Sequence, residues 1–272
     1  MPNFDFPSND YQLDFFSYDH YFCEMTIYGQ PPEYFNSFSA LFLSLIGFFG
    51  LFKGLKIPDI TYIYTSFIVN GIASFLYHYT NYLGWGLMDR FSMIMIAIYF
   101  YNLAFKIFEF FDLCSPFFDI LRVFSTFYFT VLLTICGLQN ELLFNILFGF
   151  FLGSTILFMI LVQFMNKKFD VPTQLLNYGW KGIGLISTAG GFWILTESFC
   201  QSHWVIKYLF GHSIWHVCVA LGGYYISVLM SYLLVKSRKL KVKYLFGLPY
   251  LKYTPTNFNN NSSIETNPDY LP

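Results

Sequence analysis

The chain has 272 residues, of which 56% are hydrophobic and only 11% are charged, and its formal net charge is −1. Soluble domains carry about a quarter of their residues as Asp, Glu, Lys or Arg, so this composition excludes an ordinary soluble enzyme and predicts a protein embedded in a lipid bilayer. Nucleic acid is excluded as a partner, because the charge is balanced and no basic stripe runs along any predicted helix.

An acidic segment, residues 1–33, is the first element in chain order. It contains no Lys or Arg, and its carboxylates are Asp5, Asp10, Asp14, Asp19, Glu24 and Glu33. A secretory signal peptide begins with a positively charged region, which this segment lacks. We therefore expect the segment to be retained.

Seven long stretches with few charges follow the acidic segment. A bilayer core of about 30 Å requires about 20 apolar residues per helix, and each stretch is of roughly that length. The predicted spans are residues 34–52, 60–79, 88–108, 123–137, 142–165, 178–196 and 208–235. The sequence thus predicts an all-α integral membrane protein, with a seven-helix bundle over residues 34–235. The tail, residues 236–272, is first basic and then polar, and we expect it to be disordered.

The basic residues are distributed unevenly between the two sides of such a bundle. Arg90 and Lys207 fall on one side, with the amino terminus. Twelve others fall on the opposite side: Lys53, Lys56, Lys106, Arg122, Lys167, Lys168, Lys181, Lys236, Arg238, Lys239, Lys241 and Lys243. Because positive loops favour the cytoplasm, we expect an extracytoplasmic amino terminus and a cytoplasmic carboxyl terminus.

Polar residues inside the predicted spans gather at the extracytoplasmic side. Ser74 and His78 are four residues apart, as are His212 and His216, so each pair lies on one face of its helix. Asp89 opens the third span, at the same depth. Ionisable residues inside a membrane are energetically unfavourable and often mark functional sites. We therefore expect these five residues to share one site.

This set of side chains predicts a particular chemistry. Three imidazoles with one open position form a catalytic zinc site, where the bound water becomes the nucleophile. Asp89 would act as general base, and the Ser74 hydroxyl would donate to the oxyanion of a tetrahedral intermediate. The expected reaction is hydrolysis of a carbonyl compound, most naturally a membrane lipid. The alternative is that the histidines only pack within the bundle and that Ser74 bonds back to its own helix.

The pattern of S-x3-H, an Asp eleven residues later, and H-x3-H in the last span resembles the alkaline ceramidase family. Its superfamily also contains the adiponectin and progestin receptors. The resemblance implies zinc on His78, His212 and His216, with Asp89 and Ser74 assisting. It further implies hydrolysis of the amide of ceramide to a sphingoid base and a fatty acid, in the endoplasmic reticulum or Golgi.

Two other hypotheses are compatible with these residues. A receptor-like member of the same superfamily would bind lipid and hydrolyse little or none of it. That branch has a cytoplasmic amino terminus, opposite to the one expected here. A metal-binding structural or transport protein is the second alternative.

The amino-terminal segment is similar to the calcium-binding segment of the family. The resemblance implies Glu24 and Glu33 as ligands, with Asp19 as a substitute for a missing acid. Tyr21 stands where the family has an Asp, and Thr26 where it has an Asn. Calcium is therefore a possible second cofactor, and the alternative is an acidic segment that only satisfies the topology.

Cys23 and Cys200 both lie on the oxidising side of the predicted topology, so we expect a disulfide between them, and the family resemblance implies the same bond. Two departures from the family remain. The chain reads DRFSM where the family has D-E-L-P-M, which puts Arg90 beside Asp89. Thr196 occupies an acidic position of the family, and Glu197 follows it.

Overall fold

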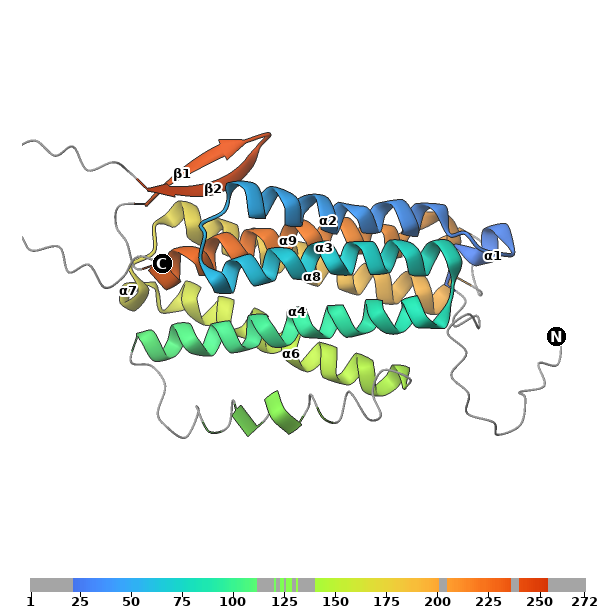
Figure 1. Cartoon of the computed structure of the whole chain (residues 1–272), viewed down its shortest axis with the longest axis horizontal. Coiled ribbons are helices and arrows are strands. Elements are labelled where there is room, and N and C mark those ends of the chain that lie inside the picture. Colours follow the sequence, from blue (N-terminus) through green and yellow to red (C-terminus); the bar gives the residue numbers. More distant parts are fainter. Residues whose placement is uncertain are drawn as a thin grey trace, which may run out of the picture.

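The computed structural model describes residues 22–111, 120, 123–124, 126–128, 131, 140–200, 205–235 and 240–253. Its long helices run side by side as one bundle, and a short hairpin lies against one end of it (Figure 1). In chain order the helices and strands are α1 (Met25–Tyr28), α2 (Tyr34–Lys53), α3 (Pro58–Thr80), α4 (Leu83–Phe110), α6 (Glu141–Phe164), α7 (Asn166–Phe169), α8 (Thr173–Phe199), the 3₁₀ helix η2 (Ile206–Leu209), α9 (Gly211–Val235), β1 (Leu240–Leu245) and β2 (Leu248–Tyr253).

Five helices of the described part are long and apolar enough to cross a membrane, namely α2, α3, α4, α6 and α9. This confirms a helical, multi-pass membrane protein. Helix α8 coincides with the predicted span 178–196 but is not among the five. The predicted span 123–137 lies largely outside the described residues. The count of seven spans and the direction of the termini therefore stay predictions.

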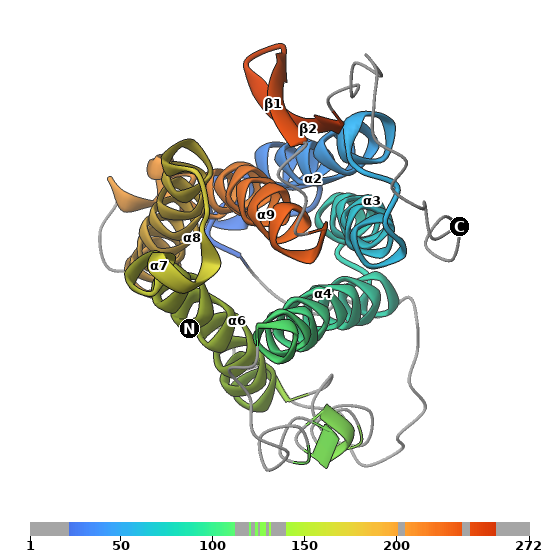
Figure 2. The same ribbon diagram turned by 90° about the vertical axis from the view of Figure 1, so that its left-hand side faces the viewer.

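The helices are arranged as a ring whose neighbours are mostly consecutive in sequence. Viewed along the bundle, α9 lies between α8 on one side and α2 and α3 on the other, while α4 and α6 close the opposite side (Figure 2). Local signals fix where two of these helices begin. Pro58 occupies the first turn of α3, where its missing N–H costs nothing. Asn140 caps α6, because its side-chain oxygen accepts from the N–H of Leu143.

Small residues let the helices that carry the histidines come close to their neighbours. A Cβ atom on Gly182 of α8 would lie 2.8 Å from the carbonyl oxygen of Gly222 in α9. A Cβ on Gly71 of α3 would lie 2.4 Å from the Ser44 hydroxyl oxygen of α2. Helices α3 and α9 are thus held at short distances from their neighbours, which fixes how their histidines face each other.

The prediction that the tail is disordered from residue 236 onward is wrong for residues 240–253, which form the antiparallel hairpin β1–β2. Apolar and basic residues alternate along β1, and this period of two gives the hairpin an apolar face. Leu251 is buried in the main core, and the Tyr224 hydroxyl donates to the carbonyl oxygen of Pro249. The segment is rich in lysine, and a prediction based on composition alone therefore missed the alternation.

Candidate metal centre

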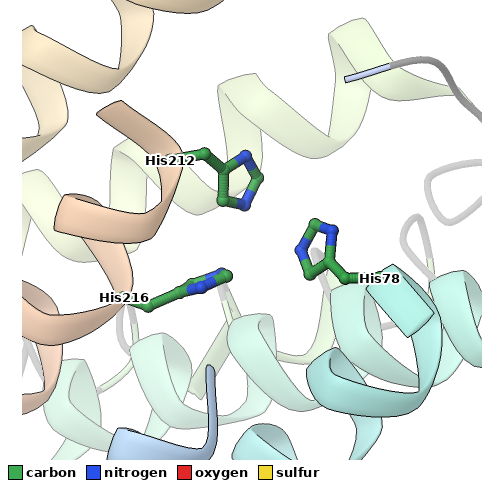
Figure 3. Close-up of side chains that lie close together, drawn as sticks. All are labelled: His78, His212 and His216. Carbon is green, nitrogen blue, oxygen red and sulfur yellow. The ribbon is translucent and has the colours of Figure 1, made fainter. Parts of the chain in front are cut away.

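Three histidines from two helices meet at one end of the bundle. His78 lies in the last turn of α3, and His212 and His216 lie one turn apart at the start of α9. All three are buried, and their ligand nitrogens lie within 4.8 Å of one another. Their rings surround a common centre (Figure 3). The structure thus brings together the three residues that the two i, i+4 pairs predicted.

Glu33, just before α2, holds His78 through two hydrogen bonds. Its Oε2 lies 2.7 Å from His78 Nδ1, and its backbone N–H donates to the His78 carbonyl oxygen at 3.0 Å. Both side chains are buried. A carboxylate in this position accepts the proton of Nδ1 and leaves Nε2 as the nitrogen for a metal.

The Nδ1 atoms of the other two histidines also contact groups outside the triad. His216 Nδ1 lies 2.9 Å from the Ser39 hydroxyl oxygen. Trp193 Nε1 donates to His212 Nδ1 at 3.0 Å, and Glu197 Oε1 lies 3.8 Å from the same nitrogen. Each imidazole is therefore oriented by a partner from another helix or segment.

This donor set fits a metal ion that takes three neutral imidazoles. Such a ligand binds through one nitrogen and gives the proton of the other to an acceptor. Glu33 and Ser39 can accept this proton, whereas Trp193 can only donate. For His212, the Trp193 N–H makes Nδ1 an acceptor in this structure, and Glu197 Oε1 lies 3.8 Å from Nδ1, beyond hydrogen-bond distance. Metal binding through Nε2 of His212 would therefore require Trp193 to turn away and Nδ1 to donate to Glu197. Zinc matches a site of three histidines with an open position.

Asp89 and Ser74 lie together beside the triad. Asp89 Oδ1 accepts from Asn70 Nδ2 at 2.8 Å, and the Ser74 side chain also hydrogen-bonds the Asp89 carboxylate. Both line the cavity that His212 and His216 line. The candidate base and two of the three candidate ligands, His212 and His216, thus face one space.

The cavity lies between α3, α4, α6, α8 and α9, and most of its wall is apolar. Arg90 lines it next to Asp89, so the departure from the family pattern falls inside the site. The apolar wall includes Phe67, Phe100, Phe144, Phe148, Leu152 and Ile226. A cavity with few polar groups at one end and aromatic walls elsewhere fits an apolar chain with one polar group.

The predicted calcium ligands have other partners. Both carboxylate oxygens of Glu24 accept backbone N–H groups at the start of α2, each at 2.8 Å, and burial raises the pKa of this carboxyl. The Thr26 hydroxyl donates to the Cys23 carbonyl oxygen. Glu33 holds His78, and Asp19 lies outside the described residues. Glu24 therefore caps a helix, and the structure lends the calcium prediction no support.

Cys23 and Cys200 are both buried free thiols, so the predicted disulfide is not formed in the structure. The two side chains are nevertheless neighbours. Burial raises the pKa of the Cys23 thiol, and a hydrogen bond with Cys200 adds to this effect. The predicted arrangement of the spans correctly placed the two cysteines close together, but their proximity does not require a disulfide between them.

Several residues around the triad had no sequence signal. Ser39 carries no motif, and the contacts that Ser39 and Trp193 make with the histidines depend on how α2 and α8 pack against α9. Thr196 is buried and donates to the Trp193 carbonyl oxygen, while Glu197 faces His212 and accepts the backbone N–H of Cys23 at 2.9 Å. The acid next to the family's acidic position therefore reaches the site.

A family model described as Ceramidase matches residues 19–255, which include the triad and all the partners described above. No curated protein matches the chain.

Proposed function

Since the chain belongs to the ceramidase family, we propose that it is a zinc-dependent membrane amidase, which hydrolyses ceramide or a related sphingolipid to a sphingoid base and a free fatty acid. The observation that carries the proposal is the triad itself. Three buried histidines, two of them more than 130 residues from the third, point at one centre beside a carboxylate.

A zinc ion in this position would polarise the amide carbonyl and make water nucleophilic at neutral pH. Asp89 would take a proton from the attacking water and deliver it to the nitrogen of the leaving amine. Asn70 holds Asp89 in place for both transfers. The Ser74 hydroxyl would turn from Asp89 to the developing oxyanion as negative charge forms there.

The cavity supports a lipid as the substrate. Its aromatic and aliphatic walls would take an acyl or sphingoid chain, while the amide lies at the polar end near His216. A lipid can reach such a site from within the bilayer without crossing water. Arg90 adds a positive charge to the wall where the family has a Glu, and we propose that it contributes to the choice of headgroup.

We place the metal centre on the extracytoplasmic side, with the amino terminus, because twelve basic residues gather on the opposite side. Residence in the endoplasmic reticulum or Golgi follows from the family resemblance. Protease protection of tagged termini in sealed microsomes tests the orientation. A cytoplasmic amino terminus would favour the receptor-like reading.

The proposed activity is tested by fatty-acid release from purified protein. Ceramides and simple esters are offered to the wild type and to His216→Ala, and the zinc content of both samples is measured. We expect zinc-dependent release from ceramide that is lost in the variant. Ser227→Ala is the matched control, because Ser227 is a buried α9 residue whose hydroxyl donates to the Gly223 carbonyl oxygen of its own helix. Wild-type protein that holds zinc and releases nothing would support a lipid-binding receptor instead.

A further inference from the structure

The turn of the β1–β2 hairpin contains an unusual residue. Phe246 and Gly247 connect the strands, and both have positive φ, 52° and 78°. A two-residue turn of this kind strongly prefers Asn, Asp or Gly at its first position, because other side chains are strained there. Phe246 is also 91% exposed, so packing within the protein does not explain it. A strained and exposed aromatic residue indicates a contact outside the chain.

The outer face of the hairpin is basic. Lys241 pairs with Lys252 and Lys243 with Tyr250, and directly paired residues project from the same face of an antiparallel sheet. All three lysines are exposed. Residues 236–253 contain six basic residues and no Asp or Glu, namely Lys236, Arg238, Lys239, Lys241, Lys243 and Lys252. The hairpin itself therefore contributes no carboxylate that could neutralise this face.

The opposite face anchors the hairpin firmly. The Tyr244 hydroxyl bonds with the Tyr178 hydroxyl and accepts from the Gln174 side chain, and Leu251 is 4% exposed. The basic face therefore points away from the helices in this structure.

The hairpin lies at the level where the apolar helix α2 ends and charged residues begin. It sits beside the carboxyl end of α2, at the end of the bundle away from the triad (Figure 1). Lys53, the last residue of α2, lies 5.9 Å from the centre of the Tyr250 ring, and the neighbouring Phe52 is 75% exposed. Lysines that follow an apolar helix mark the level of the lipid headgroups.

We propose that the hairpin is a binding site for anionic phospholipids. Lys241, Lys243 and Lys252 contact the negatively charged headgroups of the adjacent leaflet, and Phe246 enters the apolar region below them. Each lysine near an anionic surface contributes to the attraction, and an inserted aromatic ring prefers the interface. The binding site does not depend on the proposed hydrolysis; only the identity of the leaflet rests on the orientation proposed above.

Hydrogen exchange of the full-length protein in lipid nanodiscs tests the proposal. The hairpin amides are compared in discs of phosphatidylcholine alone and of phosphatidylcholine with phosphatidylserine. One variant combines Lys241→Gln, Lys243→Gln and Lys252→Gln, and a second is Phe246→Asn. We expect exchange to slow about tenfold or more when anionic lipid is present, and the triple variant to lose this effect.

The variant Phe246→Asn distinguishes two roles of Phe246, a contact with lipid and a role in forming the turn. Asn suits a positive φ, so the variant should exchange more slowly than the wild type in detergent and faster in anionic discs. The control is Lys167→Gln with Lys168→Gln, which removes two exposed charges from α7 and should keep the wild-type response. Equal exchange in both kinds of disc, or a response to anionic lipid that survives in the triple variant, would overturn the proposal.

Discussion

The two ends of the helix bundle treat their polar side chains in opposite ways. At the end with the triad, buried or half-buried polar groups bond partners from other elements, as Glu33 does with His78 and Ser39 with His216. At the end with the hairpin, Lys241 and Lys243 are exposed and project away from the core. The long-range polar contacts of the hairpin, such as those of the Tyr244 hydroxyl with Tyr178 and Gln174, join neutral groups.

The difference predicts how each end responds to mutation. A buried polar group that loses its partner keeps the full cost of its desolvation, whereas an exposed group is solvated by water. Single changes near the triad should therefore have large effects on activity, and changes at the hairpin should have small ones.

His78→Ala should have the largest effect. It removes the only triad residue contributed by α3, so we expect loss of the bound zinc and a fall in kcat/KM of about 10⁴-fold. Metal analysis and fatty-acid release measure the two losses. Chelation of the wild type should reproduce the fall, and added zinc should restore it only in the wild type. A variant that keeps the full zinc content would show that His78 is not a ligand.

Asp89→Asn should have the next largest effect. The amide keeps an oxygen that can accept from Asn70 but loses the ability to take a proton, so kcat should fall about 10³-fold while zinc content is unchanged. Asp170→Asn is the matched control, because Asp170 is exposed and lies between α7 and α8. A similar fall in kcat and in zinc content would mean that Asp89 supports the metal rather than the proton transfer.

Glu33→Gln tests whether the buried contact at the triad depends on charge. The amide can still accept from His78 Nδ1, but it no longer stabilises the imidazole as strongly, so zinc affinity should fall about 10- to 100-fold. Competition with a chromogenic chelator measures the affinity. Rescue of activity at high zinc concentration is expected, because the ligands themselves remain. An activity loss that zinc does not rescue would point to a direct role of Glu33 in the reaction.

Much of the site could be predicted from the sequence, because its main residues are local pairs inside apolar spans. The spacing of His212 and His216 fixes one helical face, and the alternation of spans placed His78 at the same end. The acidic segment was also expected near this end. These predictions rest on helix geometry and on the length of a membrane span, which the sequence shows directly.

The contacts that orient the histidines could not be predicted in this way. Ser39 and Trp193 reach the triad only because α2 and α8 rotate their particular faces toward α9, and rotation depends on the packing of side chains. Glu33 was expected to bind calcium, since a carboxylate offers the same oxygens to a metal ion and to an imidazole. The hairpin was missed because its alternation covers only six residues per strand.

Ser39→Ala should have a smaller effect than the change at Glu33. The hydroxyl holds His216 by one neutral hydrogen bond, so zinc affinity should fall about tenfold or less. Ser154→Ala is the control, because Ser154 is half-buried and its hydroxyl donates to the Phe150 carbonyl oxygen of its own helix. Equal affinities in the two variants would show that the packing of α2 alone suffices to orient His216.

Tyr244→Phe should have the smallest effect, and it tests the hairpin end directly. The change removes a hydroxyl that bonds Tyr178 and Gln174 in a half-buried position, so the free energy of unfolding should fall by about 1 kcal/mol or less. Thermal unfolding in detergent measures this difference. Because the exposed end shares no polar contact with the triad among the described residues, kcat/KM should stay within about twofold of the wild type. A larger loss of activity would mean that α8, which carries Tyr178 near one end and Trp193 near the other, transmits a shift at the hairpin to His212.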